Sequence, residues 1–300
     1  MEYIDKKTHD LLEYAISLSI TDIHFDISNT FQVIRFRRHK KTIETIHNVM
    51  ATNMYEHLKF IANFDLSQKD VPQTGRFMMV FERNYYFRFA AIESFGRKNG
   101  VVRILNIVLV HTIFECIRNK RTIKSLLSVF QCSSGLVLYS GGTGSGKSTT
   151  LFNTLKELKQ ESIYSIENPI ERYYEHVVQL EPIRKRLSNE DIMNQLLRMD
   201  ADVLVYGEVR TKMDLQLCLK AVNMGHLVCA TIHSRGLVST LDRLYDLGAT
   251  HYAIESSLVG ILYHKLNSSK GGVLFQHEFM GQNQIIQLLA QQQKTCKEDI

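Results

Sequence analysis

A glycine-rich turn lies near the middle of the chain and reads Gly141-Gly142-Thr143-Gly144-Ser145-Gly146-Lys147-Ser148-Thr149. The apolar run before it, Gly135–Ser140, has the length and composition of a short buried β-strand. After it, apolar residues recur at helical spacing over Thr150–Leu158. Although the string alone could be an ordinary glycine-rich turn, a strand, a G-x-x-x-x-G-K-[ST] turn and a helix in this order indicate a P-loop.

The chemistry of such a loop points to a bound triphosphate. Its consecutive backbone N–H groups converge on one point and can hold an anionic phosphate, and the amino end of the helix adds partial positive charge. Lys147 is expected to reach the β- and γ-phosphates, and the Ser148 hydroxyl to ligate Mg²⁺. We therefore expect ATP and Mg²⁺ to bind at Gly141, Gly142, Thr143, Gly144, Ser145, Gly146, Lys147, Ser148 and Thr149.

The rest of the C-terminal half predicts an α/β fold. Three short and nearly all-apolar runs, typical of buried parallel strands, alternate with helical patterns: Ser162–Ile166, Asp202–Tyr206 and His226–Thr231. Together with the P-loop they predict a mainly parallel sheet covered on both faces. The last twenty residues are polar and rich in glutamine, and we expect them to form a frayed tail.

The N-terminal part predicts a separate small α+β domain, which gives a division into residues 1–112 and 113–300. A turn is expected at Pro72–Phe77 and a loop at Ser94–Gly100. The expected elements are helices at Lys7–Ile20 and Met54–Phe64 and strands at Asp22–Ile27, Phe31–Arg37, Thr42–Ile46, Arg76–Phe81 and Tyr85–Ile92.

Composition excludes several other classes of protein. A formal net charge of +5 over 300 residues is low for a dedicated nucleic-acid binder, so no direct nucleic-acid binding is expected. The sequence contains no run of eighteen apolar residues for a membrane span, and its first residues lack the apolar core of a signal peptide. The five cysteines are scattered, so we expect reduced, buried thiols of a cytosolic protein and neither a disulfide framework nor a zinc site.

Candidate catalytic side chains follow the predicted strands, where the carboxyl ends of a parallel sheet meet the nucleotide. Glu167 and Glu171 follow the first run and Glu208 the second, while His226 and His233 flank the third. A carboxylate here can hold Mg²⁺ or orient the attacking water, so all three glutamates are candidate bases. Both histidines are candidate sensors of the γ-phosphate, although each could instead be structural.

Taken together, these motifs resemble the secretion ATPase family that drives type II secretion and type IV pilus assembly. Within that family the compact length looks most like the competence pilus (pseudopilus) assembly ATPase of Gram-positive bacteria. Besides the P-loop, the resemblance is carried by an acidic box, a Walker B region, a histidine box and two N-terminal segments: Ile166–Glu171, Leu197–Arg210, Gly225–His233, Asp22–Phe25 and Pro72–Phe77.

Some positions depart from the family pattern. Asn168 stands where the family has Asp, Ala201 replaces a proline, and Thr211 replaces the acid that usually follows G-E-[IV]-R. Only five residues separate Leu266 from Gly272, where many members carry a four-cysteine zinc module. The resemblance therefore implies no metal beyond Mg²⁺.

The resemblance implies a hexameric ATP-hydrolysing motor with a RecA-like ATPase domain and a PAS-like N-terminal domain. It places the nucleotide between one subunit and the next, where Arg88 and Arg103 would approach the phosphates in trans. It also implies a cytoplasmic protein on the inner membrane face, held there by a polytopic platform protein, that powers pilus assembly for DNA uptake. The alternatives are a conjugative (type IV) secretion ring ATPase and a nucleotide-binding scaffold or regulator without turnover.

Overall fold

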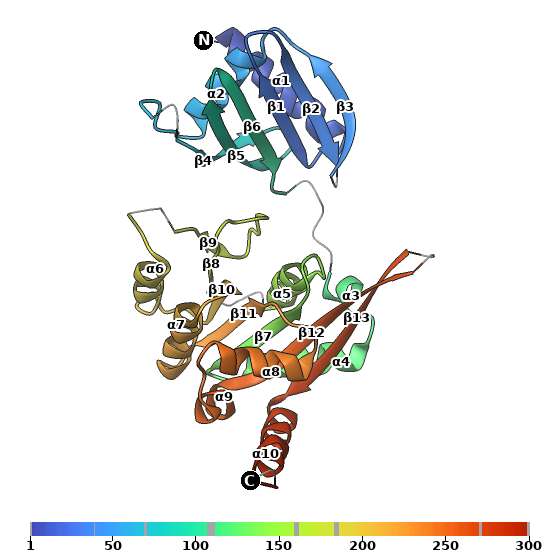
Figure 1. Cartoon of the computed structure of the whole chain (residues 1–300), viewed down its shortest axis with the longest axis vertical. Coiled ribbons are helices and arrows are strands. Elements are labelled where there is room, and N and C mark those ends of the chain that lie inside the picture. The colour runs from blue at the N-terminus through green and yellow to red at the C-terminus, as the bar shows by residue number, and fades with distance from the viewer. Residues whose placement is uncertain are drawn as a thin grey trace. The chain divides into compact units, whose positions relative to one another are not determined.

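The computed structural model describes residues 2–38, 40–68, 71–106, 112–158, 162–182, 186–269 and 272–298. The chain forms two compact units, Met1–Leu109 with Glu171–Tyr173 and Val110–Ile170 with Tyr174–Ile300 (Figure 1). The division lies a few residues before the predicted boundary at 112/113. None of the described helices has the long apolar stretch that crossing a bilayer requires.

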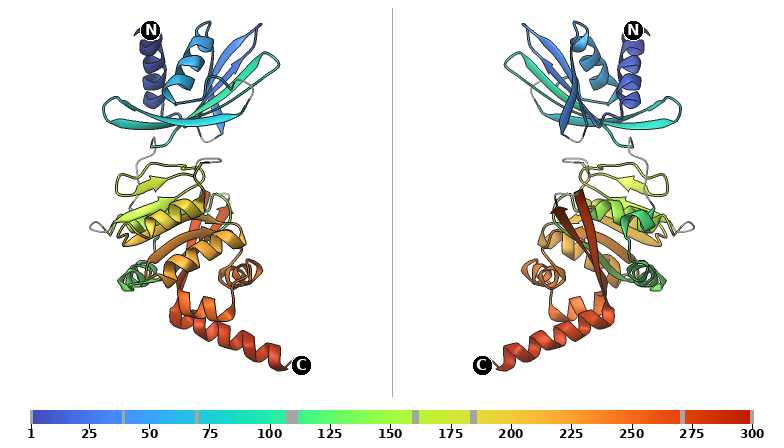
Figure 2. Two further views of the ribbon diagram at one scale, coloured as in Figure 1. Left: turned by 90° about the vertical axis from the view of Figure 1, so that its left-hand side faces the viewer. Right: turned by 90° about the vertical axis from the view of Figure 1, so that its right-hand side faces the viewer.

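The N-terminal unit contains one antiparallel sheet with strand order β3-β2-β1-β6-β5-β4. Two helices, α1 and α2, pack side by side against one of its faces (Figure 2). The elements are α1 (Glu2–Ser17), β1 (Asp22–Ile27), β2 (Gln32–Arg38), β3 (Lys41–His47), α2 (Ala51–Ile61), β4 (Gln73–Val80), β5 (Asn84–Ser94) and β6 (Arg97–Ile104).

Side chains alternate between the two faces of this sheet, as the pleat of a strand requires. Phe87 and Phe89 of β5 and Val102 of β6 are fully buried in the core beneath the helices. Arg88, which lies between the two phenylalanines, and Arg103, which follows Val102, therefore point to the opposite face, which the helices leave uncovered. Two of the predicted site residues thus lie on the open face of the N-terminal sheet.

Two local predictions for this unit are wrong. The predicted turn at Pro72–Phe77 lies within β4 from Gln73 onward. The predicted loop at Ser94–Gly100 shrinks to a two-residue turn, because Ser94 already pairs with Arg97 across the hairpin. Phe95 and Gly96 both have positive φ, 48° and 74°, which suits a tight turn between twisted strands.

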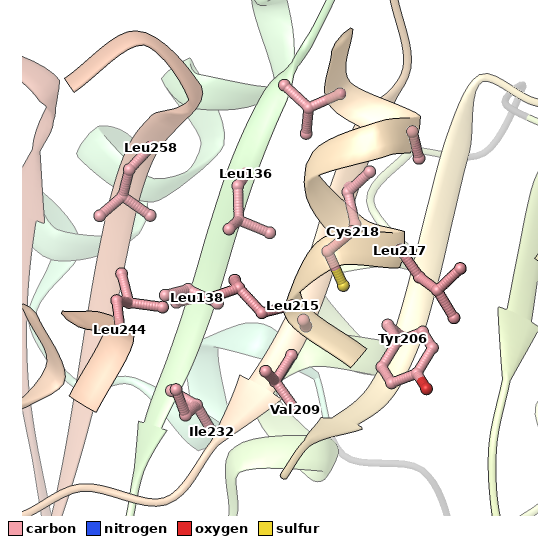
Figure 3. Packing of buried hydrophobic residues seen from close by; sticks show 14 of the residues in the cluster. Leu136, Leu138, Tyr206, Val209, Leu215, Leu217, Cys218, Ile232, Leu244 and Leu258 are labelled. Carbon is pink, nitrogen blue, oxygen red and sulfur yellow. The ribbon is translucent and has the colours of Figure 1, made fainter. Parts of the chain in front are cut away.

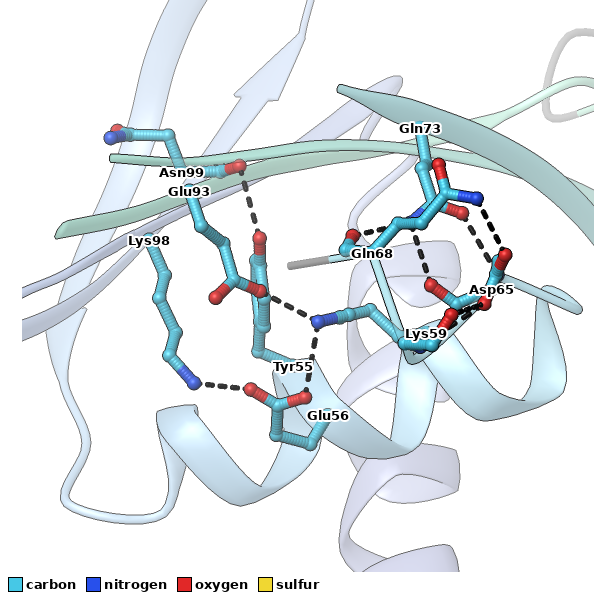
Figure 4. Close-up of polar contacts among 10 residues, drawn as sticks. Tyr55, Glu56, Lys59, Asp65, Gln68, Gln73, Glu93, Lys98 and Asn99 are labelled. Carbon is cyan, nitrogen blue, oxygen red and sulfur yellow. Dashed lines mark hydrogen bonds and ion pairs between the residues drawn. The ribbon is translucent and has the colours of Figure 1, made fainter. Parts of the chain in front are cut away.

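Helix α2 is tied to the sheet by a partly buried ionic network (Figure 4). The Lys59 ammonium group is 2.7 Å from Glu93 on β5 and 3.4 Å from Glu56 on its own helix, and Glu56 also pairs with Lys98 on β6. Lys59 is only 5% exposed. A charge this buried requires its partners, and removing Glu93 would leave the ammonium with only the longer contact to Glu56.

The C-terminal unit contains a seven-stranded sheet with strand order β13-β12-β7-β11-β10-β8-β9 (Figure 1). Every described pair is parallel except β12 with β13, which confirms the predicted α/β fold with a mainly parallel sheet. The elements are α3 (Ile113–Cys116), α4 (Lys120–Ser128), a 3₁₀ turn (Val129–Gln131), β7 (Gly135–Gly141), α5 (Lys147–Leu155), β8 (Ile163–Ile166), β9 (Val178–Leu180), α6 (Asn189–Leu196), β10 (Val203–Val209), α7 (Lys212–Asn223), β11 (Leu227–Ile232), α8 (Leu237–Asp246), α9 (His251–Ser257), β12 (Leu258–Ser269), β13 (Gly272–Gly281) and α10 (Gln282–Glu298).

Helices cover both faces of this sheet. Leu136 and Leu138 of β7 contribute to a core with α6–α10, part of which Figure 3 shows. Val137 and Tyr139, which point the other way, pack against α3, α4 and α5. All seven residues of β7 are buried, so the strand that leads into the P-loop has the near-continuous apolar run of a central parallel strand.

The predicted tail at the C-terminus is wrong. Residues Gln282–Glu298 form helix α10. Ile285 and Leu289 are four residues apart, lie on one face of this helix and are 0% and 1% exposed. A pair of apolar residues at helical spacing is thus enough to dock a segment that is otherwise polar.

The cysteines only partly follow the prediction. Cys218 and Cys229 are buried, but Cys116 is partly exposed and Cys132 is exposed, because it lies in the turn just before β7. The side chain of Cys296 lies outside the described residues. The segment between Leu266 and Gly272, where relatives carry a zinc module, belongs to the β12–β13 hairpin, but residues 270 and 271 lie outside the described range.

Candidate active site

The P-loop connects β7 to α5 and has the conformation that the sequence predicts. Gly146 is the N-cap of α5 and has φ of +89°, a left-handed conformation that glycine adopts without strain. No atom lies within 4 Å of the positions where a Cβ would extend from Gly142 or Gly144. The loop therefore borders open space into which a ligand can enter.

Lys147 lies across this loop. Its Nζ donates hydrogen bonds to the carbonyl oxygens of Gly141 and Gly142, at 3.0 and 2.9 Å, and the residue is 8% exposed. The ammonium group is thus held over the same backbone whose amides would surround a phosphate. A phosphate oxygen can replace these carbonyls as the acceptor, because an ammonium group binds an anionic oxygen more strongly than a neutral one.

Glu167 follows β8 and is buried, with 8% exposed. Its Oε1 accepts hydrogen bonds from the Ser165 hydroxyl at 2.7 Å and from Gln179 Nε2 at 2.9 Å. A Cβ added to Gly207 would lie 3.2 Å from the Cγ of Glu167, so the backbone of β10 passes directly beside this carboxylate. Glu171, in contrast, is exposed.

Glu208 and His233 meet at the ends of the neighbouring strands β10 and β11. His233 Nε2 lies 2.9 Å from Glu208 Oε1, and Arg210 Nε donates to Glu208 Oε2 at 2.7 Å. The Thr231 hydroxyl donates to the backbone carbonyl of Gly207 and fixes the two strand ends together. The carboxylate is therefore held from two sides.

The electrostatics of His233 connect this pair to the P-loop. Burial lowers the pKa of His233, the charge of Lys147 lowers it further, Glu208 opposes the shift and Arg210 adds to it. In its neutral form the imidazole can donate one hydrogen bond and accept another. Because β11 lies between β7 and β10, the three side chains Lys147, His233 and Glu208 share one edge of the sheet.

The two histidines that the sequence offers as sensors of the γ-phosphate lie at opposite ends of β11. His226 precedes β11, its Nδ1 lies 3.0 Å from the Ala201 carbonyl, and its own carbonyl accepts from the amide of Gly135 at the start of β7. Strand β11 has six residues, so its two ends lie about 20 Å apart. Since β11 is parallel to β7, only its carboxyl end can approach the P-loop.

The two arginines implied by the resemblance lie in the N-terminal unit. Arg88 on β5 pairs in register with Arg103 on β6, and Arg103 Nε donates to Asp22 Oδ1 at 2.7 Å. The strand registers extend this pair into one row across the open face, which reads Arg37, Asp22, Arg103, Arg88 and Arg76.

One departure from the family pattern has a clear structural role. Thr211 is the N-cap of α7, and its hydroxyl and the Asp214 carboxylate satisfy each other's backbone amides in a capping box. Asp214 also accepts from the Arg210 amide at 3.0 Å. The threonine therefore stabilises the turn between β10, which contains Glu208, and α7.

Sequence reasoning missed the side chains that hold the glutamates. Ser165 interrupts an apolar strand with a polar residue, which was an available signal. Arg210 was visible only as part of the motif around Glu208. Gln179 lies on the three-residue strand β9, twelve residues after Glu167, and no local pattern links the two.

The donors expected to hold Mg²⁺ are present and chemically suitable. Ser148 is an exposed residue in the first turn of α5. The Glu208 carboxylate lies near the carboxyl end of β10, at the same edge of the sheet. Oxygen donors of this kind, completed by water and phosphate, are what Mg²⁺ prefers. The fold and these groups together define a protein of the mixed α/β class with a glycine-rich loop at the carboxyl end of a central parallel strand.

Comparison with known proteins assigns the family. The family model described as "Type II/IV secretion system protein" matches residues 1–298, so the chain belongs to this family. It is 30% identical over 266 residues to the putative type II secretion system protein E of Escherichia coli K12. The aligned region covers 85% of this chain and 53% of that protein. It is 26% identical over 273 residues to the competence protein ComGA of Bacillus subtilis, with coverage of 89% and 77%.

Solved structures show the same fold. The pilus retraction motor PilT with bound ADP has a TM-score of 0.75 at 20% identity and covers 96% of this chain and 88% of its own. The ATPase DotB of Legionella pneumophila has a TM-score of 0.69 at 21% identity, with coverage of 93% and 82%. The chain spans about half the length of the type II secretion relatives that it matches.

Proposed function

We propose that the chain is the ATP-hydrolysing motor subunit of a competence type IV pilus or pseudopilus, a type II secretion-like machine for DNA uptake. The observation that carries this proposal is the grouping of Lys147, Glu167, Glu208 and His233 at the carboxyl ends of neighbouring strands. The similarity to ComGA over 89% of the chain supports the competence assignment.

Each group at this edge has a role that its environment supports. The backbone of Gly141–Thr149 and Lys147 bind the phosphates, and Ser148 and Glu208 hold Mg²⁺, partly through water. When bound, Mg²⁺ neutralises charge on the phosphates. Glu167 is buried and held by two donors, so it is the glutamate best placed to orient and polarise the attacking water. His233, in contact with Glu208, reports the state of the γ-phosphate.

The assembly is proposed to be a ring of six subunits in which a PAS-like N-terminal domain completes the RecA-like site of its neighbour. The row on the open N-terminal sheet face supports this, because it contains four arginines and one aspartate. The row therefore carries net positive charge, which suits a surface that approaches phosphates. Arg88 and Arg103 are thus the proposed trans groups that neutralise transition-state charge.

The proposed setting follows from the same relatives. The motor would work in the cytoplasm, bound peripherally at the inner membrane face through a polytopic platform protein of the pilus machine. ATP binding and hydrolysis would shift the domains between two arrangements and so move that platform. Neither zinc nor a nucleic acid is required at the site.

Phosphate release by the purified full chain tests the enzymatic part. We expect Lys147→Ala and Glu208→Gln each to lower the rate by about 10²-fold or more, because each removes a charge that is matched to phosphate or metal. Lys156→Ala at the exposed far end of α5 is the matched control and should keep the wild-type rate. Unchanged rates in the first two variants, against a real wild-type rate, would show that the site is assigned wrongly.

Two further outcomes separate the alternatives. A wild-type hexamer that releases no phosphate in the presence of Mg²⁺ would support a nucleotide-binding scaffold. A strain carrying Lys147→Ala should lose piliation and transformation. If it instead loses plasmid transfer, the chain is a conjugative secretion ATPase.

A further inference from the structure

A buried histidine lies behind the P-loop without a hydrogen-bond partner. His264 on β12 is 1% exposed, and neither Nδ1 nor Nε2 makes a hydrogen bond of good geometry within the part of the chain that the structure describes, although the ring lies next to the backbone of Ser145. Buried polar atoms in folded proteins are nearly always paired, because an unpaired one loses its hydration without compensation. The two orphaned nitrogens therefore require an explanation.

The position of His264 is set by two strand registers. It pairs with Gly141 on β7, the first residue of the P-loop, and with His277 on β13. A Cβ added to Gly141 would lie 2.5 Å from the His264 carbonyl oxygen, 2.8 Å from the Ser145 hydroxyl and 3.1 Å from the His264 Cβ. Gly141, Ser145 and His264 thus meet around one point, and the contact is too close for any residue but glycine at 141.

Ser145 has the same deficit as His264. It is 2% exposed, and its Oγ has no hydrogen-bond partner among the described residues. Its amide donates to the Gly142 carbonyl at 3.3 Å, so Ser145 forms part of the curl of the loop itself. Two buried and unpaired groups, one on the loop and one on the strand behind it, are therefore neighbours.

Their chemistry is complementary. Burial lowers the pKa of His264 well below its ordinary value, and His277 and Lys147 lower it further, while the Ser145 backbone opposes the shift. The ring is therefore neutral, with one N–H donor and one acceptor nitrogen. A serine hydroxyl can both donate and accept, so the two side chains can satisfy each other when they face one another.

We propose that His264 is a positioning residue of the P-loop, which pairs with Ser145 when a phosphate binds and thereby holds the loop in its phosphate-binding curl. In the described state Lys147 is engaged with the carbonyls of Gly141 and Gly142. A phosphate that draws Lys147 away frees these carbonyls, and the loop then depends on the support behind it. This inference rests on the proposed nucleotide site.

The test is a double-mutant cycle on the full chain, read out as the Kd of a fluorescent ADP analogue alongside the KM and kcat of phosphate release. We expect Ser145→Ala and His264→Phe each to raise Kd and KM by about 10-fold with a smaller change in kcat. The double variant should bind no more weakly than either single variant, because both remove the same interaction. His264→Gln, which keeps a donor and an acceptor, should recover part of the affinity.

His277→Phe is the matched control, because its ring lies 4.7 Å from that of His264 and it is on β13, one strand further from the loop. It should leave Kd unchanged. Multiplicative effects in the cycle, or wild-type affinity in both the His264→Phe and the Ser145→Ala variants, would overturn the inference. If wild-type protein binds no nucleotide, the proposed function fails instead. Should His264→Phe not fold, His264→Leu, which also removes both nitrogens, takes its place in the cycle.

Discussion

Glu167 shows how a single residue is prepared for catalysis by neighbours that the motif does not include. A carboxylate that accepts hydrogen bonds from a hydroxyl and an amide is fixed in position and stabilised in its charged form. Ser165 supplies the first of these from the same strand, and Gln179 supplies the second from β9. The orientation of the attacking water would depend on both.

We predict that Ser165→Ala lowers kcat by about 10-fold while KM stays within about twofold, because it removes one charge-assisted hydrogen bond from the proposed base. Steady-state phosphate release measures both constants. Ser257→Ala is the control, since Ser257 is also buried but lies on α9. A change in KM alone would show that Ser165 serves binding and not the chemical step.

Much of this candidate site could be predicted from sequence, because its residues follow strands that the apolar pattern reveals. Lys147, Glu208 and His233 come together for that reason. His226 lies apart from these three, because a strand separates the two residues that flank it by its whole length. The supports Gln179 and His264 could not be predicted, since their contacts depend on strand pairing between distant segments.

At the level of elements, the local pattern was most reliable where a strand is buried on both faces. The runs at β7, β8, β10 and β11 were found with shifts of up to three residues at their ends. Errors arose where composition was allowed to outweigh spacing. Polar content concealed the strand from Arg97 and the helix from Gln282, although Ile285 and Leu289 carried the helical spacing.

Helix α10 provides a test of this point. We predict that Leu289→Ala lowers the midpoint of thermal unfolding of the C-terminal unit by roughly 5–10 °C, because it leaves a cavity where a fully buried leucine packs. Differential scanning calorimetry of the full chain measures the shift. Gln287→Ala, at an exposed position of the same helix, should have no effect. Equal midpoints in both variants would mean that α10 does not dock on the core.

For the whole molecule, a site completed by the next protomer has a consequence that no monomeric enzyme shares. A head-to-tail contact uses two different surfaces of each subunit, so a defect in one surface can be compensated by a neighbour that is defective in the other. The P-loop and the arginine row belong to different units of the chain, which makes the two defects separable.

We predict that mixing two inactive variants, Lys147→Ala and Arg88→Ala, restores phosphate release. In rings of random composition about a quarter of the sites would combine an intact P-loop with an intact Arg88 from the neighbour. The assay is phosphate release after the variants are mixed, disassembled and reassembled. The control is a mixture of the Lys147→Ala variant with the double variant that carries both substitutions. It should stay inactive, because no protomer in it has an intact P-loop. An inactive mixture would argue that each protomer completes its own site.

Strand β7 lies in the interior of its sheet between β11 and β12, whereas β9 is a three-residue strand at the outer margin. The loop proposed to bind the phosphates is consequently anchored on an interior strand that is paired on both sides. Gln179, which positions the proposed water-activating Glu167, lies on a short strand at the end of the sheet. A mechanical load on β9 could change the rate of ATP hydrolysis while the nucleotide stays bound. In a motor of the proposed kind, hydrolysis could then stop under load without release of the nucleotide.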